Sequence, residues 1–457
     1  MRTIPGLRDL VLAAAAAVVA TAGAVVVHSQ PEDTTRKITG TVDSAPGLAW
    51  STSAAGFGRA GAEFRDPRWG TEFDTVGTGF VDGGNTLVTV LGVPDDGYLR
   101  DPVLVGIDAG TGAKRWQTPA ADLTGCGSTP VDGQVVCFGY DRVIVGYDLT
   151  TGDATRTPTT WFPFAIATLD DRVYVAEGDV ESDDVRVHAG TLADPDAYWS
   201  RAFDMGALWE DPLFDALDVS HGQGVFTLGA DIAGFDLASG KPTWTTTRDG
   251  CTDAGATSGA LLVRARTGCG DDEVTGSALL DRSGRTIATS NSGVAQTLSI
   301  DLPTDDTVPV LLGDSGYDRR TGSLLWTNSD LITAPRETDA TTGTAAAIFG
   351  DVALLQDTDA HNTTGLDLRT GHRLWRTDTT RFGTILGWDG HTIVLSDYTG
   401  LWAIDPRTGA ISWDIPFLAV NTDTEALTGF GQLAAHGEGR YTYASAQTII
   451  GLRPLRH

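Results

Sequence analysis

The chain has 457 residues, and its 32 Lys and Arg against 60 Asp and Glu give a formal net charge of −28. A surface this acidic repels phosphate backbones and anionic headgroups, which excludes nucleic acid as a partner class. Hydrophobic residues make up 41% of the chain, enough for a substantial core, so an extensively disordered chain is not expected either.

The first element in chain order is an apolar run. Residues 10–27, LVLAAAAAVVATAGAVVV, carry no charge and follow Arg2 and Arg8. At the rise of an α-helix this run spans about 27 Å, which is enough to cross the hydrocarbon core of a bilayer. The basic flank predicts that residues 1–9 stay in the cytoplasm and that the rest of the chain is exported.

We therefore expect a transmembrane anchor at 10–27, a linker over 28–45 and an extracytoplasmic domain over 46–457. The alternative is a cleaved signal segment, because Ala20-Thr21-Ala22 offers small residues near the end of the run. In that case the protein is secreted rather than a single-pass membrane protein.

An eleven-residue pattern then recurs along the chain. Five near-complete copies are GIDAGTGAKRW (106–116), GFDLASGKPTW (234–244), GYDRRTGSLLW (316–326), GLDLRTGHRLW (365–375) and AIDPRTGAISW (403–413). Weaker copies are GYDLTTGDATR (146–156), in which Arg156 replaces the tryptophan, GTLADPDAYW (190–199) and LLDRSGRTI (279–287). Internal repeats spaced by roughly 40–50 residues are typical of solenoids, propellers and arrays.

The residues of the pattern predict a β-hairpin. A short apolar strand ends at the Asp, whose side chain can accept from the backbone N–H groups of the turn, and the Gly can adopt positive φ. The second strand ends in a Trp that carries a large apolar area into the gap between neighbouring units. The predicted blade-docking residues are Trp50, Trp116, Trp244, Trp326, Trp375 and Trp413.

Short β-rich runs separate the hairpins, for example GQVVCFG (133–139) and GDVALLQD (350–357), and no helical periodicity is sustained after residue 40. Each period therefore holds about four strands, as in a blade of a β-propeller. We predict an all-β propeller of about eight four-stranded blades, although nine periods can be counted, one of which need not form a full blade. The run PGLAWS (46–51) is expected to close the ring by joining the last blade.

The four cysteines form two local pairs, Cys126 with Cys137 and Cys251 with Cys269. Zinc sites need closer spacing such as Cys-x-x-Cys, whereas disulfides persist outside the cytoplasm. We expect two disulfides, in agreement with export.

The pattern A-x-D-x-x-T-G-x-x-x-W resembles the repeats of PQQ-like propellers, a family that includes quinoprotein alcohol dehydrogenases and the outer-membrane assembly lipoprotein BamB. The resemblance covers about residues 46–453. The dehydrogenase branch implies pyrroloquinoline quinone and Ca²⁺, but this chain has no adjacent cysteines and no position that matches the catalytic aspartate motif. The BamB branch implies a non-enzymatic envelope scaffold, from which this chain departs by having an apolar segment in place of a lipobox cysteine.

No catalytic or metal-binding motif is evident. The eight histidines are scattered without ligand spacing, and the acidic clusters at 179–184, 270–273 and 301–306 do not fit a calcium-loop pattern, so solvated loops are expected there. We expect neither an enzyme nor a bound cofactor. The alternative is a degenerate quinoprotein or another small-ligand enzyme that uses the central funnel.

The expected function is a binding scaffold outside the cytoplasmic membrane, with envelope proteins as partners and the N-terminal helix in the membrane. Recognition would use loops that the repeat does not specify. An unusually apolar segment, WFPF (161–164), can mark a partner site or core. The candidate partner surface consists of Trp161, Phe162, Phe164 and Trp209.

Overall fold

The computed structural model describes residues 39–40, 46–72, 77–121, 123–179, 184–203, 205, 216–220, 222–247, 252–257, 260–266, 274–290, 307–333, 342–377, 381–421, 423–429 and 431–455. Among these residues, no helix has the length and apolar composition needed to span a bilayer. The expected membrane segment, 10–27, lies outside them.

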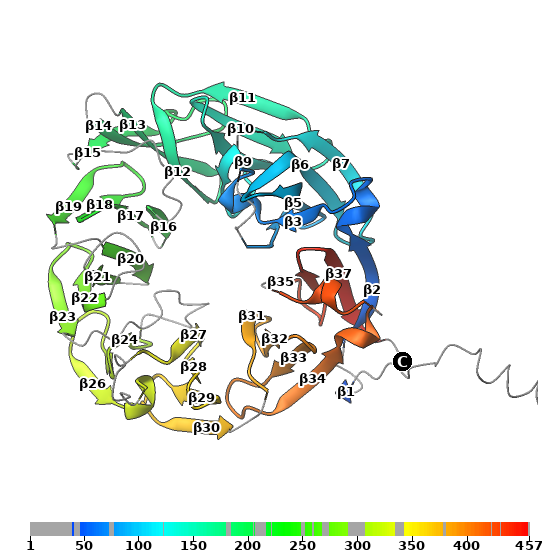
Figure 1. Cartoon of the computed structure of the whole chain (residues 1–457). Coiled ribbons are helices and arrows are strands. Elements are labelled where there is room, and N and C mark those ends of the chain that lie inside the picture. Colours follow the sequence, from blue (N-terminus) through cyan, green and yellow to red (C-terminus); the bar gives the residue numbers. More distant parts are fainter. Residues whose placement is uncertain are drawn as a thin grey trace, which may run out of the picture. The chain divides into compact units, whose positions relative to one another are not determined.

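The described chain is all-β, and its strands form nine antiparallel sheets that follow one another in chain order around a ring (Figure 1). Eight sheets have four or five strands, and one has three described strands. The predicted eight four-stranded blades of a propeller are therefore confirmed. The sixth sheet has three described strands, and residues 291–306 before it lie outside the described residues.

The first four sheets contain the strands that follow, in chain order. The first sheet has β3 (Glu63–Arg65), β4 (Val81–Asp82), β5 (Thr86–Asp95), β6 (Tyr98–Asp108) and β7 (Lys114–Pro119). The second has β8 (Leu123–Cys126), β9 (Gln134–Gly139), β10 (Val143–Asp148) and β11 (Ala154–Pro158). The third has β12 (Phe162–Leu169), β13 (Arg172–Asp179), β14 (Asp184–Gly190) and β15 (Trp199–Phe203). The fourth has β16 (Leu217–Ser220), β17 (Gln223–Leu228), β18 (Asp231–Asp236) and β19 (Pro242–Thr247).

The remaining sheets continue the series. The fifth has β20 (Thr252–Thr257), β21 (Ala260–Arg266), β22 (Val274–Asp281) and β23 (Thr286–Ser290), and the sixth has β24 (Val310–Leu312), β25 (Ser315–Tyr317) and β26 (Leu324–Thr327). The seventh has β27 (Ala345–Phe349), β28 (Val352–Asp357), β29 (Asn362–Asp367) and β30 (Arg373–Thr377). The eighth has β31 (Thr384–Trp388), β32 (Ile393–Ser396), β33 (Gly400–Ile404), β34 (Ile411–Pro416) and β1 (Thr39–Gly40). The ninth has β35 (Gln432–Ala435), β36 (Tyr441–Ala444), β37 (Thr448–Pro454) and β2 (Pro46–Ser53). Short 3₁₀ helices are η1 (Ala54–Phe57), η2 (Pro67–Trp69), η3 (Ser329–Leu331), η4 (Phe417–Ala419) and η5 (Glu425–Leu427).

The two ends of the described chain meet in the ninth sheet, as predicted. Strand β2 pairs antiparallel with β37, and Trp50 lies opposite Gly451. The chain before it also pairs with the ring, because β1 adds to the outer edge of β34. Strand pairing by the N-terminal segment thus closes the ring and covers one outer edge.

The strand order gives the ring two different faces. In Figure 1 the first strand of each sheet lies toward the middle and the last strand at the rim. Because every sheet repeats this order in the same sense, the turns between second and third strands share one face. The motif turns, between third and fourth strands, share the opposite face.

The hydrophobic core is divided among the junctions between sheets. The described residues form nine buried clusters, and each lies between two neighbouring sheets. A sheet of this kind is apolar on both faces, because both are covered by neighbours. Stability therefore depends on how well successive sheets dock.

A tryptophan occupies most of these junctions. Its indole N–H donates to a backbone carbonyl of the next sheet, and the pairs are Trp50 to Ala109 (3.0 Å), Trp116 to Leu149 (3.0 Å), Trp199 to Leu237 (3.0 Å), Trp326 to Leu368 (2.8 Å) and Trp375 to Pro406 (2.7 Å). Trp413, which is 1% exposed, packs on Tyr441 of the ninth sheet with ring centroids 5.5 Å apart. Trp244 contacts the turn at Gly284 of the fifth sheet.

Both clean and degenerate copies of the motif form the outer hairpin of a sheet. The sixth sheet, with three described strands, carries the clean copy GYDRRTGSLLW. The degenerate copies at 190–199 and 279–287 lie in four-stranded sheets, and Trp199 docks like the tryptophans of clean copies.

Replacing Trp413 by Ala is expected to lower the free energy of unfolding by about 3–5 kcal/mol, because a fully buried ring leaves a cavity between two sheets. Trp375→Ala should cost less, since that ring is only half-buried. Urea denaturation followed by circular dichroism measures both. Tyr398→Ala is the control, because its side chain is 81% exposed and surface changes usually stay within about 0.5 kcal/mol. If Trp413→Ala and Tyr398→Ala lowered the free energy of unfolding equally, the docking role of Trp413 would be contradicted.

Candidate functional site

The motif turns are built around one carboxylate each. In the first sheet, Asp108 Oδ1 accepts from the backbone N–H of Gly110 (3.1 Å) and of Thr111 (2.9 Å), and from the Thr111 hydroxyl (2.8 Å). Backbone N–H and hydroxyl groups bind the corresponding aspartate in the same way in other copies, for example at Asp318 and Asp405. The aspartate thus satisfies donors that the turn leaves without strand partners.

The glycine of the motif is required for two reasons. Gly112 has φ of 71°, which favours glycine, and a Cβ there would lie 2.3 Å from the ring of Trp50 in the preceding sheet. Gly371 has φ of 69° and faces Trp326 with the same spacing. The turn of one sheet is therefore the docking surface for the tryptophan of the sheet before it.

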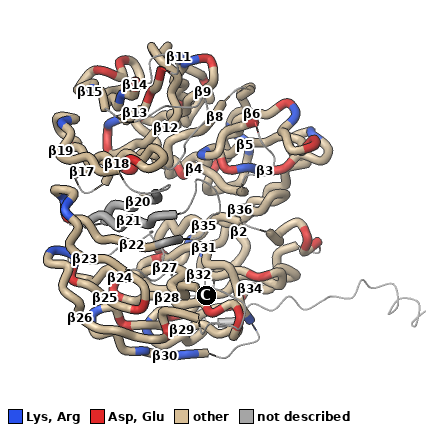
Figure 2. The backbone as a smooth tube through the Cα atoms, turned by 60° about the vertical axis from the view of Figure 1, so that its left-hand side comes forward, with Lys and Arg blue, Asp and Glu red and all other residues tan. Residues whose placement is uncertain are grey.

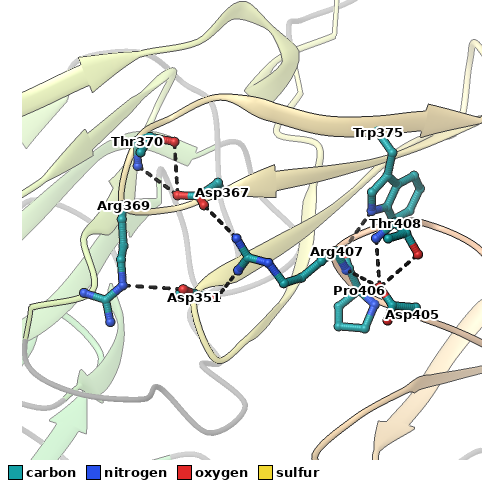
Figure 3. Close-up of polar contacts among 9 residues, drawn as sticks. All are labelled: Asp351, Asp367, Arg369, Thr370, Trp375, Asp405, Pro406, Arg407 and Thr408. Carbon is teal, nitrogen blue, oxygen red and sulfur yellow. Dashed lines mark hydrogen bonds and ion pairs between the residues drawn. The ribbon is translucent and has the colours of Figure 1, made fainter.

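Arginines reinforce one of these junctions (Figure 3). Arg407 of the eighth sheet donates to Asp351 at 3.0 Å and to the motif residue Asp367 at 3.2 Å, and Arg369 lies 3.4 Å from Asp351. Beside them the Trp375 indole N–H reaches the Pro406 carbonyl. The whole arrangement links the seventh and eighth sheets, so this polar cluster is structural.

Two junctions lack the motif tryptophan. Between the fifth and sixth sheets the turn at Gly322 faces Ile287, and the junction between the second and third sheets differs as follows. Arg156 occupies the position of the motif tryptophan and is exposed. Leu192 of the third sheet fills the gap instead: a Cβ on Gly146 would lie 2.0 Å from its side chain. The Thr157 hydroxyl donates to the Leu192 carbonyl at 2.7 Å. Leu192 packs there against an apolar cluster that includes Val136 and Val173.

A buried titratable cluster lies in the third sheet on the side that faces the second. Glu177 and His188 are 3% and 6% exposed, and Glu177 Oε2 lies 3.6 Å from His188 Nε2. The other ring nitrogen of His188 is hydrogen-bonded to the carboxylate of Asp196, an exposed residue of the β14–β15 loop. Burial raises the pKa of Glu177, an effect that the electrostatic interaction with His188 opposes.

This cluster could not be found from the sequence, because its three residues are separated and belong to different strands and loops. The signal that could have located the junction is the replacement of tryptophan by Arg156. Wherever the motif tryptophan is lost, the gap it would fill must be occupied by other side chains.

The predicted partner surface is only partly present. Trp161 is half-buried and stacks with the guanidinium of Arg186, 4.9 Å from its ring centre. Phe162 and Phe164, 4% and 0% exposed, are core residues of β12 and not surface residues. The prediction that they form a partner surface is wrong, because WFPF is the start of an inner strand and both faces of that strand are buried. Trp209 lies outside the described residues.

The disulfide expected between Cys126 and Cys137 is confirmed, and it joins directly opposed residues of β8 and β9. Cys251 and Cys269 lie outside the described residues, as do the acidic clusters at 270–273 and 301–306 and most of the cluster at 179–184. In the part of the chain that the structure describes, no three His, Cys, Asp or Glu side chains converge as a metal site.

Fold and junctions together define a β-propeller whose repeated motif is used to dock one sheet on the next. Residues 311–455 match the sequence model of the family described as "Outer membrane protein assembly factor BamB". The predicted resemblance is thereby confirmed: residues 311–455 carry repeats similar to those of the PQQ-like, BamB-type propellers. No curated protein matches the chain.

Three solved structures illustrate the similarity. BamB from Moraxella catarrhalis is 17% identical, with 83% of this chain and 96% of that chain covered and a TM-score of 0.39. The quinohemoprotein alcohol dehydrogenase from Comamonas testosteroni is 12% identical, with 91% and 78% covered and a TM-score of 0.47. The computationally designed Ika8 protein is 14% identical, with 77% and 99% covered and a TM-score of 0.41. Structural similarity at these sequence identities and TM-scores carries no information about function.

Replacing the motif residue Asp108 by Asn should destabilise the fold more at neutral than at acid pH. The hydroxyl of Thr111 and the guanidinium of Arg115 hold the pKa of Asp108 below its ordinary value of 3.8. Its stabilising contribution is therefore present above that value and is lost as pH falls through the folded-state pKa. Melting temperatures of D108N and wild type, measured from about pH 7 to about pH 3, should converge at the acid end. Asp153→Asn, at an exposed position in the next motif turn, is the control, and a gap that widens in acid would contradict the role of Asp108.

Replacing Glu177 by Gln should have the opposite pH dependence. Because burial raises the pKa of Glu177 above its ordinary 4.5, its contribution to stability is greatest below that value and is lost as pH rises through the folded-state pKa. The melting temperature of E177Q minus that of wild type should become more positive between about pH 4 and pH 8. Glu425→Gln, at an exposed site, should show no such trend. A difference that is constant with pH would contradict the assignment.

Proposed function

We propose that this protein is a non-enzymatic scaffold that binds other proteins outside the cytoplasmic membrane. The observation that carries the proposal is the match of residues 311–455 to the BamB family. The fold supports it, because the Asp, Gly and Trp of the repeat are all engaged in turns and in contacts between sheets. Binding is therefore assigned to turns outside the motif.

Two features support a location outside the cytoplasm. Cys126 and Cys137 are disulfide-bonded, and structural disulfides persist in oxidising compartments. The uncharged run 10–27 with its basic flank has the composition of a single-pass anchor with the propeller on the far side of the membrane. We propose that the anchor is retained and that it holds the scaffold close to its partners in the cell envelope.

Photo-crosslinking of the full-length protein in cells tests this function. A photoreactive residue introduced at exposed turns should trap one defined exported protein, which is identified by mass spectrometry. Recovery of self-crosslinks alone, together with a small-molecule chromophore that co-purifies with the propeller in the presence of pyrroloquinoline quinone and Ca²⁺, would favour the enzyme alternative and overturn the scaffold.

A further inference from the structure

Three exposed tyrosines lie on the face of the ring opposite the motif turns. Tyr98, Tyr140 and Tyr398 are 55%, 38% and 81% exposed, and each lies in or directly beside the turn that joins the second and third strands of its sheet. These sheets are the first, second and eighth, which with the ninth form one continuous arc of the ring. Large aromatic side chains at the tips of several turns of one face make this face a candidate interaction surface.

Carboxylates accompany these rings. Asp96 and Asp141 are exposed next to Tyr98 and Tyr140, and Asp397 directly precedes Tyr398. A ring face beside a carboxylate is suited to a cationic side chain, through cation–π attraction and charge pairing together.

The molecule itself binds an arginine in this way at the same edge of the eighth sheet. The guanidinium of Arg381 lies 3.9 Å from the ring centre of Trp402 and donates to Asp397 and Asp414, each at 2.9 Å. The combination of aromatic ring and aspartate therefore already holds a guanidinium one residue away from Tyr398.

The net charge of the chain favours some classes of partner for this face over others. With a net charge of −28, and with Asp and Glu spread over turns around the ring (Figure 2), a second copy of this chain and an anionic membrane surface are both repelled. A cationic protein segment is attracted, and its approach is accelerated by the same field.

We propose that the turn face, defined by Tyr98, Tyr140, Tyr398, Asp96 and Asp141, binds a protein segment that carries lysines and arginines. This inference rests on the proposed scaffold function and specifies its binding face and the chemistry of its partner. The face that carries the motif turns has the structural role, and the turn face has the recognition role.

The test uses the full-length protein in detergent and a fluorescein-labelled peptide with Lys and Arg among Gly and Ser, compared with a peptide in which Asp and Glu replace the basic residues. Fluorescence anisotropy should show binding of the basic peptide only. The triple variant Y98S/Y140S/Y398S should bind it about ten-fold more weakly, as expected for the loss of three exposed cation–π contacts. D96N/D141N should weaken binding of the basic peptide, and the affinity of this variant should depend less on salt concentration.

The matched control is L324S/L325S/I411S, which removes three other exposed hydrophobic side chains, 58%, 49% and 60% exposed, from outer strands. It should bind like wild type. Equal affinity of the tyrosine variant and wild type would reduce the interaction to general charge attraction and overturn the proposal, and so would absence of binding by wild type. If the crosslinking experiment still traps a defined exported partner, the scaffold function stands and only the assignment of this face fails.

Discussion

The ring depends on one contact, the indole of a motif tryptophan packed on the motif turn of the next sheet. The tryptophan N–H binds the carbonyl that follows the motif aspartate, as with Trp375 and Pro406, while the ring covers the glycine of the same turn. Each copy of the motif thus provides a tryptophan that packs on the next sheet and a turn that receives the tryptophan of the preceding sheet. Because every copy serves two neighbours, the sequence of the repeat is constrained far more strongly than the rest of the blade.

Two junctions show how the contact can be replaced. Between the fifth and sixth sheets Ile287 faces the turn at Gly322, and between the second and third sheets Leu192 fills the gap. Glu177 and His188 occupy the same junction, where burial disfavours the ionised carboxylate. A junction that holds a buried carboxylate of raised pKa is expected to respond to pH.

The fold could be predicted because the repeat encodes local geometry. Turn, glycine and tryptophan lie within eleven residues, and the pairing of the first strand with the last follows from a missing outer strand. The surroundings of the inner strands could not be predicted, since the motif says nothing of inner strands. Likewise, Phe162 and Phe164 are apolar in sequence whether they face a partner or a neighbouring sheet, and only the strand order distinguishes the two. The cluster of Glu177 and His188 arises from tertiary contact alone.

Closure of the ring by β2 and β37 ties the order of synthesis to the order of folding. The strand that completes the ninth sheet, β2, is made early, but its partner β37 is the last strand made, so β2 must wait for almost the entire chain. Until then the growing chain is an arc with open strand edges, which invite pairing with other chains. Contacts of such long sequence separation form slowly. A truncated or stalled chain would therefore lose more than its final strands. It would also lack the pairing of β2 with β37, and with it the closure of the ring on which the other sheets depend.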